Sequence, residues 1–498
     1  MAQPERCQSG RTGRSRKPLC GQLYRGFESL PLRYCFLLIL LFALTAIKAE
    51  AQPAYSITLL ELRSYEGTYE YKNHSTLQIA ASPVDTMLYA LIGDARYRLR
   101  PYRQDVFLNS GKQEVQFVHK GPSIIGYKVT EDTLLYRLVS RNVTFSDKMW
   151  FARPCGGKPF VYHYTVPIDR NDGLSTGSLV YSGLDTALIR KLIDRIVDGS
   201  YPNVHSILIV KDGKLILEEY FYEYDAGTPH QLRSATKTFA SALVGIAIDK
   251  GLIKSVGDRV IPYFPEYAIR NLDARKEAIT IKSLLTQESG LACNDDDPGS
   301  PGNETKIYPT DDWANSILNL PMEESPGQKG SYCSGNIILL DRIVEKSSHQ
   351  SLHDFAAQNL FGKLGITDFK WDFVPDKSHE DDFGQVNLKP RDMAKFGLVY
   401  LNGGQWKGTQ IISANWVSQS LQKHSTIRGI DYGYLWWREP LTANGVVYEG
   451  MAAKGNGGQR IFIWPDQNMV AVITAGNYNA QSPANKLLIE CVLGGLKR

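Results

Sequence analysis

The stretch Ser234-Ala235-Thr236-Lys237 begins a predicted helix and decides how the rest of the chain is interpreted. A hydroxyl and an amine three positions apart lie on one face of a helix, so the amine can reach the hydroxyl's proton. The apolar spacing from Phe239 to Ala247 predicts that this helix is buried, and Gly251 is typical of a helix end. Ser234 is therefore expected near a helix N-terminus, where free backbone N–H groups favour an oxyanion.

Two other short motifs match nucleophile patterns, but their surroundings argue against catalysis. The S-x-x-K spacing recurs at Ser420 and Lys423, in a polar stretch that predicts a solvated helix end. Ser175 lies in a G-x-S-x-G pattern, which in α/β-hydrolases joins a buried strand to a helix. Neither element is predicted around Ser175, so we interpret residues 168–177 as a linker.

Two further segments place polar residues and glycines between predicted secondary-structure elements. Residues 326–336 read Pro-Gly-Gln-Lys-Gly-Ser-Tyr-Cys-Ser-Gly-Asn and precede a helical pattern over 337–345. Residues 453–459 read Ala-Lys-Gly-Asn-Gly-Gly-Gln and precede two runs rich in β-branched and aromatic residues. These runs, 461–464 and 469–474, flank a Pro-Asp turn and predict an antiparallel hairpin.

In this order the motifs resemble the serine β-lactamase and penicillin-binding-protein superfamily, which carries S-x-x-K, then Tyr-x-Asn or Tyr-x-Ser, then a strand with Lys-x-Gly, His-x-Gly or Ala-x-Gly. The resemblance covers residues 178–498. It implies an α+β fold of the β-lactamase/transpeptidase type, in which helices flank an antiparallel sheet and form a second, all-helical subdomain. A predicted hairpin at 206–217 would join the C-terminal strands in that sheet.

The resemblance also implies a set of site residues. The catalytic residues would be Ser234, Lys237 and Tyr332, and the substrate or oxyanion contacts would be Ser334, Gly455 and Asn456. Ser234 would attack an ester or amide carbonyl to form an acyl-enzyme. Burial would lower the pKa of Lys237, which would act with Tyr332 as the base. No cofactor or metal is expected, because the nine His are scattered and no C-x-x-C or H-E-x-x-H pattern occurs.

Two positions depart from the β-lactamase pattern. Ser334 stands where lactamases usually carry Asn, and Ala453 stands where they carry Lys or His. Lys454 is adjacent, but successive side chains of a strand point to opposite faces. These variants are more similar to the esterase, amidase and 6-aminohexanoate-dimer-hydrolase branch, so we expect a small-molecule or short-peptide ester or amide as substrate. The alternatives are a true β-lactamase or DD-peptidase, or a non-catalytic protein that binds peptidoglycan fragments.

The N-terminal segment predicts export. Basic residues up to Arg33, an apolar run over 34–47 and a small-residue site at 49–51 are typical of a signal peptide spanning residues 1–51. We therefore expect a periplasmic or secreted protein without a stable membrane anchor after cleavage. Cleavage takes eight Lys/Arg and three Asp/Glu from a formal charge of +4, which leaves −1 and no argument for nucleic-acid binding. The oligomeric state stays open.

Residues 52–167 are expected to form a domain of their own. They are rich in Tyr, Val, Ile and Thr, and turn residues separate short alternating runs, which predicts a small all-β barrel or sandwich. The phrases at 66–69 and 97–99 resemble lipocalin-like accessory domains that accompany such hydrolases. Packing support and ligand contact are both open as roles for this domain.

Four of the seven cysteines lie beyond the predicted signal peptide, at Cys155, Cys293, Cys333 and Cys491. Export permits disulfides. Cys293 follows a Ser-Gly-Leu turn and Cys333 adjoins Tyr332, so both are expected near the active-site cleft. A Cys293–Cys333 bridge and two buried free thiols remain open alternatives.

Overall fold

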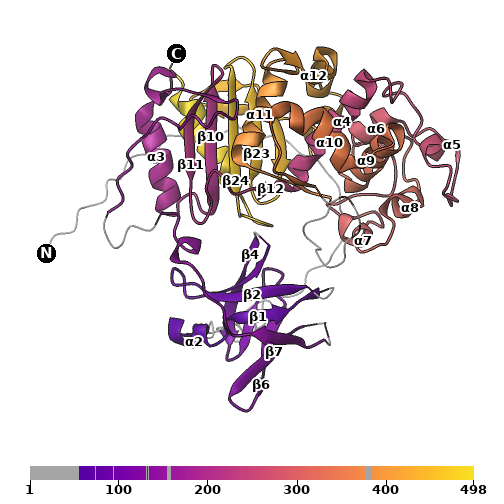
Figure 1. Cartoon of the computed structure of the whole chain (residues 1–498). Helices are drawn as coiled ribbons and strands as arrows, with labels where there is room; N and C mark the ends of the chain where they lie inside the picture. The colour runs from indigo at the N-terminus through magenta and orange to yellow at the C-terminus, as the bar shows by residue number, and fades with distance from the viewer. Residues whose placement is uncertain are drawn as a thin grey trace, which may run out of the picture. The chain divides into compact units, whose positions relative to one another are not determined.

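The computed structural model describes residues 55–72, 75–93, 95–130, 132, 134–153, 159–371, 373, 375 and 384–497 (Figure 1). The predicted signal peptide and Cys155 lie outside the described residues. Within those residues, we find no helix with the length and apolar character that crossing a membrane requires.

The predicted small β domain is a closed barrel, which confirms the all-β prediction. A short helix, α2 (Leu59–Arg63), precedes it. Its strands pair in chain order, and β1 closes the barrel by pairing with β8. Buried aromatic rings, including Tyr69, Phe107 and Phe117, fill its core. The strands are β1 Gly67–Glu70, β2 Thr76–Ala81, β3 Leu88–Ile92, β4 Ala95–Arg103, β5 Val106–Leu108, β6 Glu114–Lys120, β7 Ser123–Val129 and β8 Tyr136–Ser140.

A nine-stranded sheet forms the frame of the catalytic region. Both predicted hairpins are present as β10–β11 and β23–β24, and β10 pairs antiparallel with β24, so strands from both ends of the region share one sheet. The order across the sheet is β17 (Ser425–Ile427), β18 (Ile430–Tyr432), β19 (Trp437–Arg438), β22 (Met451–Gly455), β23 (Gln459–Trp464), β24 (Met469–Ala475), β10 (Val204–Lys211), β11 (Lys214–Tyr220) and β9 (Ser175–Thr176).

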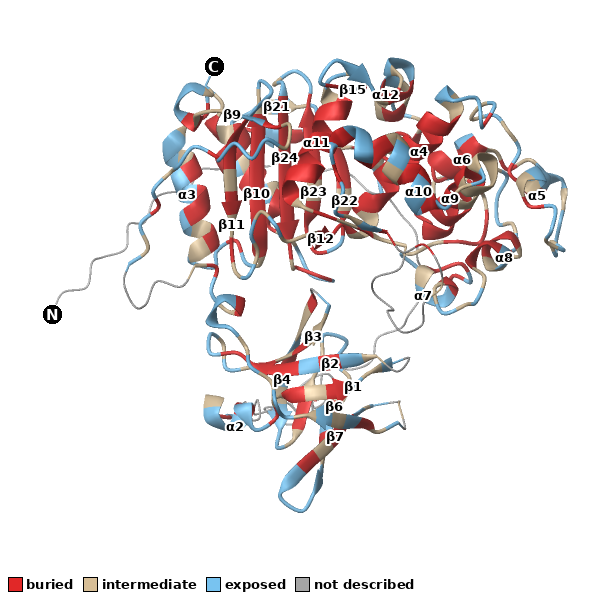
Figure 2. Cartoon of the chain, in the orientation of Figure 1, coloured by how far each residue is buried: buried red, intermediate tan, exposed pale blue. Residues whose placement is uncertain are grey.

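The central strands of this sheet are buried along their whole length, as Figure 2 shows for β10 and β24. Their unbroken Val, Ile and Ala runs are typical of strands covered on both faces. Helix α11 packs on β23 and β24, where Gly397 lets it approach Val470 closely. Helix α3 packs against the C-terminal helical turns. The predicted α+β fold is therefore confirmed.

Most of the remaining helices lie between β11 and β22 in the chain and form the helical subdomain (Figure 1). Helix α4 packs on α9, and its first turns also contact β22, so this buried helix joins the subdomain to the sheet. The helices are α3 Thr186–Val197, α4 Thr236–Asp249, α5 Ala274–Glu277, α6 Ile281–Leu285, α7 Glu304–Ile307, α8 Trp313–Leu318, α9 Ser334–Ser348, α10 Leu352–Ala356, α11 Pro390–Leu401, α12 Ala414–Leu421 and α13 Ala484–Leu487.

Short strands complete the fold: β12 His230–Gln231, β13 Lys370–Trp371, β14 Val386–Leu388, β15 Gln405–Trp406, β16 Thr409–Gln410, β20 Leu441–Ala443 and β21 Val446–Tyr448. The stretch interpreted as a linker contributes β9, because Ser175 and Thr176 pair parallel with β11. The second S-x-x-K serine, Ser420, is fully buried in α12 and donates to the Trp416 carbonyl, whereas Lys423 is exposed. The prediction of a solvated helix end therefore holds for Lys423 and is wrong for Ser420.

Candidate active site

Ser234 lies in a short 3₁₀ turn, Arg233–Ala235, immediately before α4. The preceding residue, Arg233, has a φ of 50°, which is a strained backbone conformation for a residue other than glycine. The ammonium of Lys237, one turn into the helix region, donates to Ser234 Oγ at 3.0 Å. Lys237 is almost completely buried, whereas Ser234 is only partly buried.

Tyr332 comes from the segment before α9 and lies beside the same lysine. The Lys237 Nζ is 5.0 Å from the centre of the Tyr332 ring. Two further side chains contact the Tyr332 ring. Trp437 stacks on it with ring centres 5.8 Å apart, and the central carbon of the Arg428 guanidinium lies 4.3 Å from the ring centre. Sequence motifs that are 95 positions apart therefore meet around one ammonium group.

The three motifs open into a cleft of about 420 Å³. Ser234, Tyr332, Gly455 and Asn456 all line it, together with Asp295, Glu304, Arg428, Ile430, Trp437, Lys454, Arg460 and Asn479. Two backbone segments approach each other so closely at position 455 that glycine is required there, because a Cβ atom would lie 2.1 Å from the Leu232 carbonyl oxygen. The end of β22 is thus pressed against the segment that leads into Ser234.

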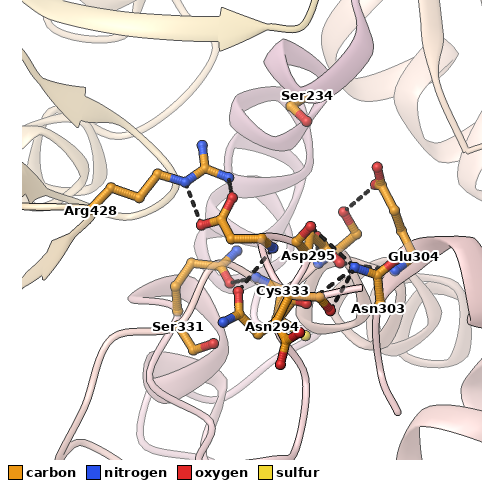
Figure 3. Close-up of polar contacts among 12 residues, drawn as sticks. Ser234, Asn294, Asp295, Asn303, Glu304, Ser331, Cys333 and Arg428 are labelled. Carbon is orange, nitrogen blue, oxygen red and sulfur yellow. Dashed lines mark hydrogen bonds and ion pairs between the residues drawn. The ribbon is translucent and has the colours of Figure 1, made fainter. Parts of the chain in front are cut away.

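Two acidic residues of the cleft wall, Asp295 and Glu304, were not singled out from the sequence. Asp295 accepts the backbone N–H groups of Ser334 at 2.7 Å and of Glu304 at 3.0 Å. Ser334 donates its hydroxyl to Glu304 at 3.0 Å. In Figure 3, Arg428 and Glu304 approach from opposite sides and Asp295 lies between them.

Ser334 has a different place from the one expected for a substrate contact. Its side chain is buried, and it is not among the described residues that line the cleft. It lines a small adjoining cavity with Lys237 and Tyr308 instead. From there its N–H donates to Asp295 and its hydroxyl donates to Glu304, so Ser334 influences the cleft through these two carboxylates. Gly455 and Asn456, by contrast, lie at the cleft with Ser234.

The predicted pKa shift of Lys237 has the wrong sign. Burial alone would lower the pKa, but the neighbouring Tyr332, Glu304 and Asp295 together outweigh burial and raise it above the ordinary value. Burial, and then the charge of Glu304, raise the pKa of the Asp295 carboxyl. Lys237 is therefore an ammonium at neutral pH, which fits its role as a hydrogen-bond donor to Ser234.

Successive side chains of the strand around Ala453 point to opposite faces of the sheet. Ala453 is fully buried, whereas Lys454 lines the cleft and forms an ion pair with Glu439 at 2.9 Å. Arg460 lies directly across from Lys454 on β23 and donates to the carbonyls of Gly455 and Gln459. The expectation that Lys454 points away from the cleft is therefore wrong.

A disulfide joins Cys293 to Cys333, with Cα atoms 5.4 Å apart, which decides between the two open alternatives. It ties the loop that carries Asp295 to the segment that carries Tyr332. The Asp295 N–H also donates to the Tyr332 carbonyl at 2.8 Å. Cys491 is a buried free thiol. Among the described residues, no group of three or more His, Cys, Asp or Glu is arranged to hold a metal ion.

A serine that accepts a hydrogen bond from a lysine three residues on, with a tyrosine beside that lysine and a glycine-ended strand across the cleft, is the arrangement typical of the β-lactamase/transpeptidase fold. The model of the Beta-lactamase family matches residues 189–490, more than half of the sequence, and the chain belongs to that family.

Known proteins resemble the chain over part of its length. The curated protein flp of Staphylococcus aureus strain N315 is 26% identical over 204 residues, 39% of this chain and 40% of that protein, so the chain spans about 40% of the length of the curated relatives it matches. A penicillin-binding-protein homologue from Caulobacter crescentus shares 17% identity over 64% of this chain and 99% of its own, with a TM-score of 0.50. The hydrolase EstCE1 shares 14% identity over 62% and 98%, also with a TM-score of 0.50. These structural likenesses show the fold alone.

Proposed function

We propose that this chain is an exported serine hydrolase that cleaves an ester or amide bond through an acyl-enzyme on Ser234. The observation that carries the proposal is the 3.0 Å hydrogen bond from Lys237 Nζ to Ser234 Oγ at the wall of a cleft. Because Lys237 is held as an ammonium, it is a donor, and the serine proton must leave to another group. Tyr332 is the group beside Lys237 that can take it.

In the proposed reaction, Tyr332 takes the Ser234 proton as Ser234 Oγ attacks the carbonyl carbon, and the Lys237 ammonium compensates the charge that the tyrosine carries as base. The backbone N–H groups of Ser234 and Asn456 receive the oxyanion, for which one donor typically contributes about 10²–10³ in kcat. Tyr332 then gives the proton to the departing alkoxide or amine. A water molecule, deprotonated in the same way, releases the acid from Ser234.

Labelling with a fluorophosphonate tests this proposal on the intact protein. Mass spectrometry should place one adduct on the peptide containing Ser234, and Ser234→Ala should remove both the adduct and the hydrolysis of p-nitrophenyl butyrate. An adduct on Ser175 or Ser420 would refute the assignment. Absence of any adduct would favour a non-catalytic protein that binds peptidoglycan fragments on the same scaffold.

A second candidate function, hydrolysis of β-lactams or D-amino-acid peptides, is favoured by one observation. Lys454 and Arg460 line the cleft next to Gly455, where a substrate carboxylate would find cations despite Ala453. Lys454 is nevertheless committed to Glu439, and we therefore keep ester or small-amide hydrolysis as the first proposal. A kcat/KM for nitrocefin that exceeds the value for p-nitrophenyl butyrate tenfold would reverse this order.

The proposed location is the periplasm or the exterior of the cell. The signal-peptide pattern of residues 1–51 supports it, and so does the Cys293–Cys333 disulfide, since such bonds persist in oxidising compartments. N-terminal sequencing of the protein from a fractionated cell should give a mature chain that begins at Gln52, without a membrane anchor. Recovery of the uncleaved chain from the cytoplasm would contradict the proposal.

A further inference from the structure

The charges of the catalytic cleft are unevenly compensated. Among the described residues, no Lys, Arg or His nitrogen lies within 4.0 Å of the Asp295 or Glu304 carboxylate, although both line the cleft. Their hydrogen bonds come from neutral groups, namely backbone N–H groups to Asp295 and the Ser334 hydroxyl to Glu304 Oε2. Within the described part of the chain, Glu304 Oε1 has no hydrogen-bond donor.

The cations of the cleft are occupied elsewhere. Arg428 pairs with Asp296 through two guanidinium nitrogens, Nε and Nη2, with Nε 2.7 Å from the carboxylate. Lys454 pairs with Glu439, and Lys237 donates to Ser234. Arg460 lies beside Gly455 and donates to backbone carbonyls. Lys237 responds to the charges of both Asp295 and Glu304, and Arg428 responds to that of Asp295, whereas neither cation forms an ion pair with either carboxylate.

Holding two carboxylates together in a partly buried wall costs free energy, and the raised pKa of Asp295 reflects that cost. A positive charge that enters the cleft would remove part of it, because opposite charges attract strongly where water is largely excluded. A neutral substrate of the same shape would leave the repulsion in place. This difference is a source of specificity.

We propose that Glu304, with Asp295 behind it, selects ester or amide substrates that carry a positively charged ammonium group. This inference rests on the proposed function, because it names the substrate class of the same cleft. Glu304 contacts the ammonium through the oxygen that Ser334 leaves unused, and Asp295 adds its charge from behind. The two carboxylates lie near Tyr332 and Lys237 in the cleft. The preference therefore applies to substrates whose charged group reaches that part of the cleft.

Two pairs of isosteric esters test the proposal, one for each side of the scissile bond. Acetylcholine and 3,3-dimethylbutyl acetate differ only by a charged nitrogen in the alcohol. The p-nitrophenyl esters of 4-(trimethylammonio)butanoic acid and 5,5-dimethylhexanoic acid differ in the same way in the acyl group. The wild-type protein should prefer the charged member of one pair by about tenfold to hundredfold in kcat/KM, as expected for a close contact between opposite charges.

Variants connect the preference to Glu304. Glu304→Gln should reduce the charged-to-neutral ratio to within about threefold while the neutral ester is still turned over, and Glu304→Asp should keep part of the ratio. The matched control is Glu324→Gln, which removes the same charge from an exposed position and should leave the ratio unchanged.

Two outcomes overturn the inference: no preference for either charged ester in the wild-type protein, or a preference that survives in Glu304→Gln. The wild-type comparison decides the question even if the variant does not fold. Failure of the proposed function has a different signature, since then neither member of a pair is hydrolysed and Ser234 is not labelled.

Discussion

Gly455→Ala should separate the two segments that supply the oxyanion donors. The Cβ atom of an alanine would lie 2.1 Å from the Leu232 carbonyl oxygen, and side chains essentially never approach a heavy atom closer than 3.0 Å, so the two backbones must move apart by at least 0.9 Å. Leu232 is two residues before Ser234, and Asn456 follows Gly455. The displacement therefore falls on the two N–H groups proposed to hold the oxyanion.

A misplacement of about 1 Å in a catalytic arrangement costs on the order of 10²-fold in rate, and loss of an oxyanion donor costs about 10²–10³ in kcat, or 2.7–4 kcal/mol. We therefore expect kcat of Gly455→Ala on p-nitrophenyl butyrate to fall about 10²–10³-fold, with a smaller change in KM, because the loss concerns the transition state. The overpacking itself costs about 1–3 kcal/mol, so the Tm should fall by several degrees and the protein should still fold.

The matched control is Gly227→Ala, in an exposed loop where the nearest atom to an added Cβ is a flexible Asp225 side-chain oxygen at 3.4 Å. Its kcat and Tm should stay close to the wild-type values. Steady-state kinetics and thermal unfolding of both variants provide the comparison. A folded Gly455→Ala protein whose kcat stays within about threefold of wild type would refute the idea that this close approach places the donors.

Three further results are expected. Lys237→Ala and Tyr332→Phe should each reduce kcat/KM strongly, and the double variant should be little worse than either, because the two residues handle one proton; additive losses in log kcat/KM would show independent roles. Reduction of the Cys293–Cys333 bond should lower the unfolding free energy, measured by urea titration, by about 4 kcal/mol, and should also lower activity. An unchanged activity would show that the bond does not help to shape the cleft. Burial holds the pKa of His205 well below its ordinary value, so the unfolded chain binds more protons than the folded chain in acid. The unfolding free energy should therefore fall by about 1.4 kcal/mol per pH unit as the pH drops below about 6.5. An equal slope in His205→Gln would contradict this.

The parts of the site that depend on local spacing could be predicted from the sequence. Ser234 and Lys237 share a helical turn, so their hydrogen bond follows from three positions of separation. The hairpins that frame the sheet follow from their alternating and continuous apolar runs. The order of the motifs then indicated the family, and the family supplied the expectation that Tyr332 and Gly455 meet Ser234 at one cleft.

The sign of the Lys237 pKa shift could not be predicted in this way. Burial of the helix, which the apolar spacing indicates, lowers the pKa of a lysine. The groups that raise the pKa of Lys237 are Tyr332, Glu304 and Asp295, which are 58 or more positions away in the chain. Their effect on the proton of Lys237 depends on a tertiary arrangement that no short motif encodes.

The two carboxylates are placed by long-range ties on a loop. The Asn303 side chain donates to the carbonyls of Asn294, Asp295 and Asp297, and the Cys293–Cys333 bond fixes the loop to the segment of Tyr332 over a separation of 40 positions. Ser334, at the position where lactamases usually carry Asn, then orients both acids from a distance of 30 and 39 positions. Ser334 therefore influences the cleft through these two neighbours. The short motifs indicate the family, whereas the charges that a substrate would meet in the cleft depend on what this loop brings there.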